Sequence, residues 1–267
     1  MAVPQKIIFP LLLLLLSNAL GAKTDTIYGN EVNSLGLKQG YWKKLYPNGN
    51  VAYKTYFVNN QPAGTMYRYY EDGKPMAIIE YTGNSQKPAA VQLFNTAGSL
   101  VATGFYINER QKQGLWQYFD KGLLTLQETY NDNEQLNGEQ LHYYPQSEQL
   151  YERRRFANGV PTGLYEQWDE QGRMQFEMMY KDGIQEGGVR YYYPNNQIRI
   201  EGQYQNNLRA GKWTFYDIHG KILRSVEYTN GVAADQEAID QMKSDELKRL
   251  EQNKGLYEEP ETMMQEL

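Results

Sequence analysis

The chain has no cysteine and only two histidines among its 267 residues. Without cysteine it can form no disulfide, no thiolate zinc site and no thiol nucleophile. His142 and His219 fall at different positions of distant segments, so we do not expect them to meet. Nucleophile elbows of the Gly-x-Ser-x-Gly type, phosphate-binding glycine loops and His-Glu-x-x-His motifs are also missing. We therefore expect no enzyme, with no catalytic residue, cofactor or metal, although paired carboxylates on facing strands would leave no local motif.

Basic residues form no long block. Residues 23–234 contain 22 basic and 22 acidic side chains, whereas residues 235–267 contain four basic and ten acidic ones. Because affinity for nucleic acid comes largely from lysine and arginine at the phosphates, we expect no nucleic-acid partner. The one basic cluster is Arg153, Arg154 and Arg155. A charged strand edge that resists aggregation explains this cluster, with an anionic ligand as the alternative.

The longest apolar run, from Ile7 to Leu16, is shorter than the roughly 20 residues that a membrane-spanning helix needs. It follows Lys6 and precedes several small residues, an order typical of a secretory signal peptide over residues 1–22. We expect an exported protein, periplasmic or extracellular, from a Gram-negative bacterium, with no stable membrane span after cleavage. An uncleaved membrane anchor is the alternative.

The rest of the chain repeats itself every 24 or 25 residues. Self-similarity at such a period marks solenoids, propellers or linear arrays. Eight units fill residues 40–234, and each begins with a glycine or, in the third unit, with an alanine. These first positions are Gly40, Gly64, Ala89, Gly114, Gly138, Gly163, Gly187 and Gly211.

Two further positions of each unit carry bulky side chains. The sixth position is aromatic in seven units and forms a repeated structural column: Leu45, Tyr69, Phe94, Phe119, Tyr143, Trp168, Tyr192 and Tyr216. The third position is bulky in most units: Trp42, Met66, Val91, Trp116, Gln140, Tyr165, Val189 and Trp213. Gln140 is the exception. We expect the sixth-position column to form the core of a thin sheet.

Two turn signals divide each unit into short runs of strand composition. Dipeptides such as Asn48-Gly49 and Asn230-Gly231 accept the positive φ angles of tight hairpin turns. Each unit is therefore predicted to be one β-hairpin, and stacked hairpins share a continuous core. The expected fold is all-β: an elongated array of about eight stacked antiparallel hairpins in a single twisted sheet. Because the third and sixth positions differ in parity, placing both on one face requires a bulge or strong twist.

Both ends of the array are expected to be covered. Residues 23–39 are predicted to form a half-repeat cap at the amino-terminal end. At the other end, helical spacing of apolar residues predicts a C-terminal α-helix over residues 235–255, which caps the last repeat or binds a partner. Residues 256–267, rich in glutamate, are predicted to be a disordered acidic tail.

Several segments resemble MORN repeats: Gly40-Tyr-Trp42-Lys-Lys-Leu-Tyr46-Pro-Asn-Gly49, Gly114-Leu-Trp116-Gln-Tyr-Phe119 and Gly211-Lys-Trp213-Thr-Phe-Tyr216. They are most similar to the variant MORN repeats of exported and antitoxin-like bacterial proteins. The resemblance extends over residues 40–234, and the third unit, which lacks the opening glycine and the tryptophan, departs from it most. It implies hairpin arrays that act as binding or scaffold modules, with partners that vary and no shared catalytic residue.

The 24 tyrosines are the strongest functional indication, since tyrosine combines a rigid apolar face with a polar tip. Tyrosines one position after the sixth should point away from the core if the strands alternate there. The candidate partner-binding residues are therefore Tyr46, Tyr70, Tyr144 and Tyr193. We expect a protein-protein binding or scaffold module whose partner is another envelope or extracellular protein. The alternatives are a glycan-binding module that uses exposed aromatics and an antitoxin-like immunity protein against an exported toxin.

Overall fold

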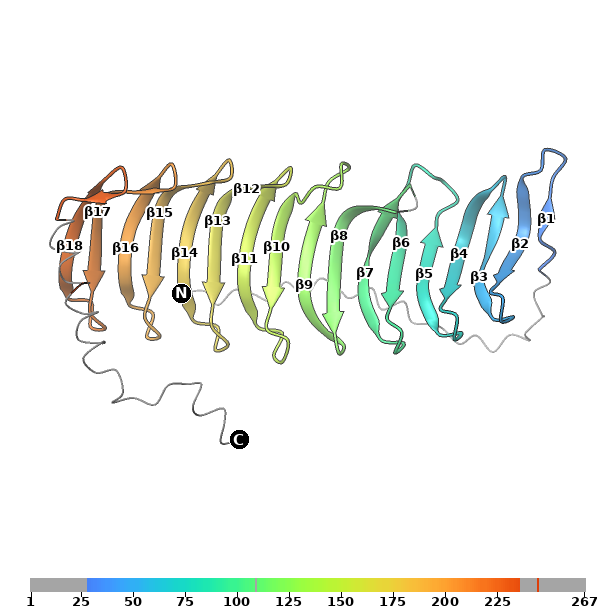
Figure 1. Ribbon diagram of the computed structural model, residues 1–267, viewed down its shortest axis with the longest axis horizontal. Helices are drawn as coiled ribbons and strands as arrows, with labels where there is room; N and C mark the ends of the chain where they lie inside the picture. Colours follow the sequence, from blue (N-terminus) through green and yellow to red (C-terminus); the bar gives the residue numbers. More distant parts are fainter. Residues whose placement is uncertain (1–27, 109, 236–243, 245–267) are drawn as a thin grey trace, which may run out of the picture.

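The computed structural model describes residues 28–108, 110–235 and 244. Within them the chain forms one unclosed antiparallel sheet of 19 strands, in which strands that follow one another in sequence lie side by side (Figure 1). The prediction of an all-β, single-sheet array is thereby confirmed. The expected leader over 1–22, the helix over 235–255 and the tail over 256–267 lie outside the described residues, apart from Asp235 and Ser244. No described helix has the length and apolar character needed to cross a bilayer.

The strands of the first half are β1 (Glu31–Val32), β2 (Lys38–Leu45), β3 (Val51–Val58), β4 (Gln61–Tyr69), β5 (Pro75–Tyr81), β6 (Ala89–Phe94), β7 (Leu100–Ile107), β8 (Gln111–Asp120) and β9 (Leu123–Tyr130). Those of the second half are β10 (Gly138–Tyr143), β11 (Leu150–Ala157), β12 (Val160–Pro161), β13 (Gly163–Trp168), β14 (Met174–Lys181), β15 (Ile184–Tyr192), β16 (Ile198–Gln205), β17 (Leu208–Tyr216), β18 (Ile222–Thr229) and β19 (Val232–Ala233). In the region of the predicted half-repeat, β1 pairs with the start of β2.

The same register recurs in every hairpin. The first position of each unit lies opposite an aromatic residue of the second strand: Gly40 opposite Phe57, Gly64 opposite Tyr81, Ala89 opposite Tyr106, Gly114 opposite Tyr130, Gly138 opposite Phe156, Gly163 opposite Tyr180, Gly187 opposite Tyr204 and Gly211 opposite Tyr228. All seven opening glycines have positive φ angles, between +61° and +124°. Glycine recurs at this position because the backbone there has a positive φ angle, which residues with a side chain rarely adopt.

A β-bulge lies at the same point of all eight hairpins, between the fifth and sixth positions. In β8 and β9, for example, Tyr118 lies opposite Leu126 but Phe119 lies opposite Leu124, so the additional residue, Thr125, belongs to the second strand. The expected bulge is confirmed, but it does not bring the third and sixth positions together. Because the first strand alternates without interruption, its odd and even positions face opposite sides. We call these the tryptophan face (third and fifth positions) and the tyrosine face (second, fourth and sixth positions).

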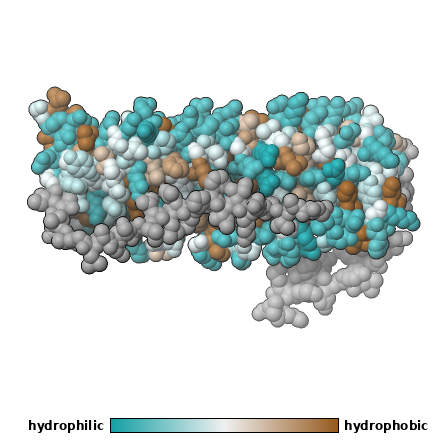
Figure 2. Space-filling view, turned by 180° about the vertical axis from the view of Figure 1, so that it is seen from behind, coloured by the Kyte–Doolittle hydropathy of each residue, from teal (hydrophilic) through white to brown (hydrophobic). Residues whose placement is uncertain are grey.

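The buried apolar residues lie on the tryptophan face rather than in the sixth-position column. Trp116 is 0 % exposed, and Val189 and Trp213 are each 1 % exposed, all at third positions. Sixth-position side chains are half-buried, except Leu45, which is 47 % exposed. Seen from behind, the array mixes hydrophobic and hydrophilic residues along its length (Figure 2). The expectation that the sixth-position column forms the core is therefore wrong, because the first strand of each hairpin alternates without interruption and places the third and sixth positions on opposite faces.

The buried core is divided into two clusters, contrary to the expected continuous core. The first cluster contains Ile79, Val91 and Trp116, and the second contains Val189 and Trp213. Between them the tryptophan face carries polar side chains, including Gln140 at the third position. Gln140, the exception among the third-position residues, therefore lies where the buried apolar core is interrupted.

Neighbouring units pack by matching the size of two side chains on the tryptophan face. Where the third position is tryptophan, the preceding unit offers a glycine: a Cβ on Gly104 would lie 2.3 Å from Trp116, and one on Gly202 would lie 2.3 Å from Trp213. Where the third position is valine, the partner is larger, as in the pair Ile79 and Val91. These three interfaces are therefore filled either by one large and one small residue or by two of medium size.

Candidate functional site: a tyrosine-lined groove

The four predicted partner-binding tyrosines link neighbouring units. Each hydroxyl donates a hydrogen bond to a sixth-position carbonyl oxygen of the next unit: Tyr46 to Tyr69 at 2.8 Å, Tyr70 to Phe94 at 2.7 Å, Tyr144 to Trp168 at 3.1 Å and Tyr193 to Tyr216 at 2.9 Å. All four side chains are half-buried. Their structural role is the joining of consecutive hairpins, and contact with a partner remains a prediction for them.

We expect Tyr144→Phe to lower the free energy of unfolding by about 1 kcal/mol, because it removes one hydrogen bond between units and leaves a carbonyl without its donor. Urea unfolding followed by tyrosine and tryptophan fluorescence would measure this. Tyr41→Phe is the control, since its hydroxyl makes no hydrogen bond among the described residues, and its effect should stay within about 0.5 kcal/mol. Equal losses in both variants would contradict the assigned role.

Exposed aromatic side chains instead gather on the tyrosine face at the amino-terminal end. Tyr28, Tyr41, Tyr56 and Tyr67 line an open groove of about 760 Å³ over β2, β3 and β4. Tyr41, Tyr56 and Tyr67 are 50 %, 39 % and 37 % exposed. Neighbouring rings meet edge to face, with centroids 6.1 Å apart for Tyr28 and Tyr41 and 5.0 Å apart for Tyr41 and Tyr56. This arrangement holds the rings in place while leaving large apolar area open to solvent.

Two lysines stand among these tyrosines. Lys43 and Lys54 lie directly opposite each other on β2 and β3. The Lys43 ammonium lies 5.6 Å from the ring centre of Tyr28, and that of Lys54 lies 5.1 Å from Tyr67 and 5.7 Å from Tyr69. Burial lowers the pKa of Lys54, but a hydrogen bond and the electrostatic effect of Tyr69 outweigh it, so the pKa is raised overall. Lys54 is therefore cationic at neutral pH.

Sequence reasoning missed this groove because it counted alternation onward from the sixth position. The groove residues lie before the bulge, at the second and fourth positions of the first strand and on the partner strand. The signal was present in the Tyr-x-Lys pattern of Tyr41 and Lys43, whose side chains share a face two residues apart. This pattern identifies a groove only together with the strand register, which places Lys54 and Tyr56 beside Tyr41 and Lys43.

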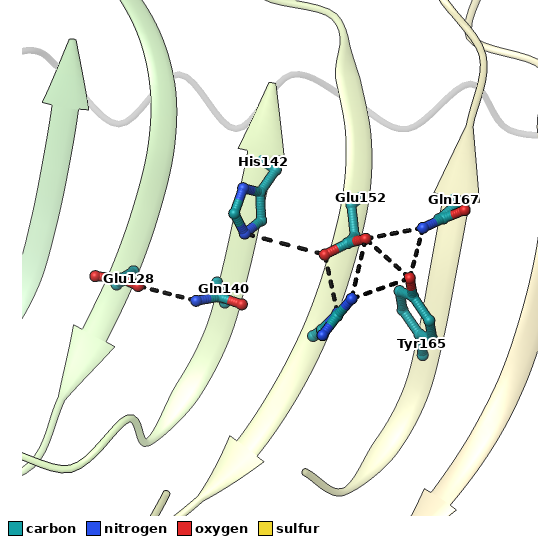
Figure 3. Close-up of polar contacts among 7 residues, drawn as sticks. Glu128, Gln140, His142, Glu152, Tyr165 and Gln167 are labelled. Atoms are coloured by element: carbon teal, nitrogen blue, oxygen red, sulfur yellow. Dashed lines mark hydrogen bonds and ion pairs between the residues drawn. The ribbon is translucent and has the colours of Figure 1, made fainter. Parts of the chain in front are cut away.

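A polar cluster fills the gap between the two apolar clusters of the tryptophan face (Figure 3). The Glu152 carboxylate accepts hydrogen bonds from Tyr165 and Gln167, both at 2.8 Å, and pairs with the Arg154 guanidinium at 2.9 Å. His142 lies 4.0 Å away. Burial by itself raises the pKa of Glu152, but the bonds from Gln167 and Tyr165 and the charge of Arg154 hold it below its usual range. Next to this group, Gln140 donates to Glu128 at 2.9 Å.

This polar cluster is internally satisfied, which argues for a structural role. Burial and the hydrogen bond to Glu152 raise the pKa of Tyr165 to about 12, so its hydroxyl remains a donor at neutral pH. No group of three or more histidine, aspartate and glutamate side chains in the described part of the chain is arranged to hold a metal ion.

The basic cluster of β11 is neutralised by neighbouring strands. Its members pair with glutamates: Arg153 with Glu166 at 3.1 Å, Arg154 with Glu152 at 2.9 Å and Arg155 with Glu139 at 3.1 Å. Because successive side chains alternate, these pairs lie on both faces of the sheet. The three arginines therefore offer little free positive charge to an anionic ligand.

The hairpin units match a known family. A family model described as the MORN repeat variant matches residues 38–59, 63–82 and 185–206. The chain contains MORN repeats. The matched segments cover nearly all of the hairpins β2–β3, β4–β5 and β15–β16, and the five other units share their register. No curated protein matches the chain. MORN repeats indicate a repeat-based binding module, and all residues that line the groove except Tyr28 belong to the first two matched repeats.

Proposed function

We propose that this MORN-repeat protein is an exported, non-catalytic module that binds another protein in the cell envelope or outside the cell. The observation that carries the proposal is the groove of Tyr28, Tyr41, Tyr56 and Tyr67. Tyrosine is enriched in protein interfaces because it offers rigid apolar area with a hydrogen-bonding tip. The apolar run at the amino terminus supports export.

The tyrosine face continues this exposed surface beyond the groove. Phe105 and Leu115, on β7 and β8, are 42 % and 36 % exposed. Exposed apolar side chains that follow one face over several strands favour an extended partner over a compact small molecule. The groove is the best-defined part of that surface because its rings are fixed by their mutual contacts.

The test is capture by the full-length tagged chain in cells, with crosslinking and mass spectrometry. We expect one dominant envelope protein, and we expect the variant Tyr41→Ser/Tyr56→Ser/Tyr67→Ser to lose it. The matched control changes three apolar residues of a second groove on the same face, Leu164, Met179 and Ile222, to serine and should retain capture. Retention by the tyrosine variant, or loss in both variants, would contradict the assignment of the groove. Absence of any captured protein, with binding to insoluble glycans, would favour the glycan alternative.

A further inference from the structure

Two lysines lie opposite each other on β2 and β3: Lys54 lines the groove, and Lys43 lies next to it over the ring of Tyr28. Like charges directly opposite each other on neighbouring strands destabilise a sheet. Neither Lys43 nor Lys54 forms an ion pair with a carboxylate of the described residues; their neighbours are tyrosine rings. Two ammonium groups without a carboxylate partner, that of the exposed Lys43 and that of the half-buried Lys54, are therefore available to an anion.

Elsewhere the tyrosine face neutralises its arginines. Arg155 pairs with Glu139, Arg153 pairs with Glu166, and Arg190 lies 2.9 Å from Glu177. On this face, these three arginines are thus each neutralised by a glutamate on a neighbouring strand. The lysine pair, at the amino-terminal end beside the tyrosine groove, has no such glutamate partner among the described residues.

The geometry of the rings distinguishes between ligand classes. A sugar stacks on an open aromatic face, but ammonium groups lie over the rings of Tyr28 and Tyr67, and the Tyr41 ring meets its neighbours edge to face. The groove therefore exposes lysine ammonium groups next to the apolar edges of tyrosine rings. Carboxylates interspersed with apolar groups complement such a surface in both charge and polarity.

We propose that the groove binds an acidic segment of the partner protein, whose carboxylates lie between Lys43 and Lys54 while its apolar side chains pack on Tyr41 and Tyr56. This inference rests on the proposed function and adds the chemistry of the partner. The anion takes the place that a cross-strand glutamate holds beside Arg155 and Arg190. Recognition is therefore expected to weaken as salt concentration rises.

Poly-L-glutamate, labelled with a fluorophore, is the probe for this site. The full chain should bind it at low ionic strength, and Lys43→Met/Lys54→Met should weaken the affinity at least about tenfold. Methionine keeps an apolar stem over the tyrosine rings while removing the charge. The control, Lys212→Met/Lys221→Met, changes net charge by the same amount at the other end of the array and should bind like the unmodified chain. Poly-L-glutamate should also raise the melting temperature of the unmodified chain but not that of the Lys43/Lys54 variant.

Three results would overturn the proposal. They are equal weakening in both variants, absence of poly-L-glutamate binding, and equal or tighter binding of hyaluronate or of phosphatidylserine vesicles at the same charge concentration. Failure here is distinguishable from failure of the proposed function. If the tyrosine variant loses the captured protein while the Lys43/Lys54 variant retains it, the groove binds a protein but not through an acidic segment.

Discussion

Gly202→Ile is expected to destabilise the folded chain by about 3 kcal/mol, because overpacking a close-packed site forces side chains and backbone to shift. Even the first added atom, Cβ, would lie 2.3 Å from the indole of Trp213, a residue that is 1 % exposed. The indole is held by a hydrogen bond from its Nε1 to the Gln203 carbonyl at 3.2 Å and lies under the Arg209 guanidinium, 4.4 Å from the ring centre. It therefore has little freedom to move aside.

A second substitution at the same interface should restore part of the lost stability. Trp213→Val alone should cost about 3–5 kcal/mol by leaving a cavity. The double variant Gly202→Ile/Trp213→Val recreates the pair that Ile79 and Val91 form elsewhere in the sheet. It should be at least about 2 kcal/mol more stable than the sum of the single effects predicts. Urea unfolding of the four proteins gives this double-mutant cycle.

Gly188→Ala is the matched control for these changes. Gly188 lies on the neighbouring strand β15, and a Cβ there would meet nothing within 4 Å. Its effect should stay within about 0.5 kcal/mol. If Gly188→Ala destabilises as much as Gly202→Ile, or if the cycle is additive, packing between units is not governed by the matched pair of side chains.

The second large effect is expected at Glu152, where Glu152→Gln should lower the free energy of unfolding at pH 7 by about 1–3 kcal/mol. The substitution keeps the size of the side chain but removes the charge that Arg154 pairs with and places an amide beside the Gln167 amide. Glu139→Gln is the control because Glu139 and Arg155 form an exposed ion pair, which should contribute less than about 1 kcal/mol.

The contribution of Glu152 should also depend on pH. Its pKa in the folded state is depressed, so its stabilising effect is fully present above the unfolded value of about 4.3 and is lost as pH falls through the folded value. The difference in unfolding free energy between the unmodified chain and Glu152→Gln should therefore shrink below about pH 4. Urea titrations at pH 7, 5 and 3.5 measure this, and a difference that stays constant with pH would contradict the role of the carboxylate.

The candidate site was less accessible from sequence than the fold. Tyr46, Tyr70, Tyr144 and Tyr193 were singled out by counting alternation past the sixth position, but their hydroxyls bond to the next unit near the turn. The groove depends on which residues of β3 and β4 lie beside Tyr41 and Lys43, and that is a matter of pairing. A count along one strand cannot supply it.

The sequence alone determined that the chain is an all-β array of hairpins, because glycine and Asn-Gly turns recur at a fixed period and each enforces a local backbone conformation. Gln140 stood out in the third-position column, but only the structure showed that the buried core is interrupted there. Only the tertiary structure decided which face is buried, because the extra residue of each bulge lies in the second strand and the first strand keeps its third and sixth positions on opposite faces. Only strand pairing placed Lys54 opposite Lys43 and a glycine under each of two tryptophans. Local conformation follows from neighbours in the chain, whereas faces and grooves follow from register between strands.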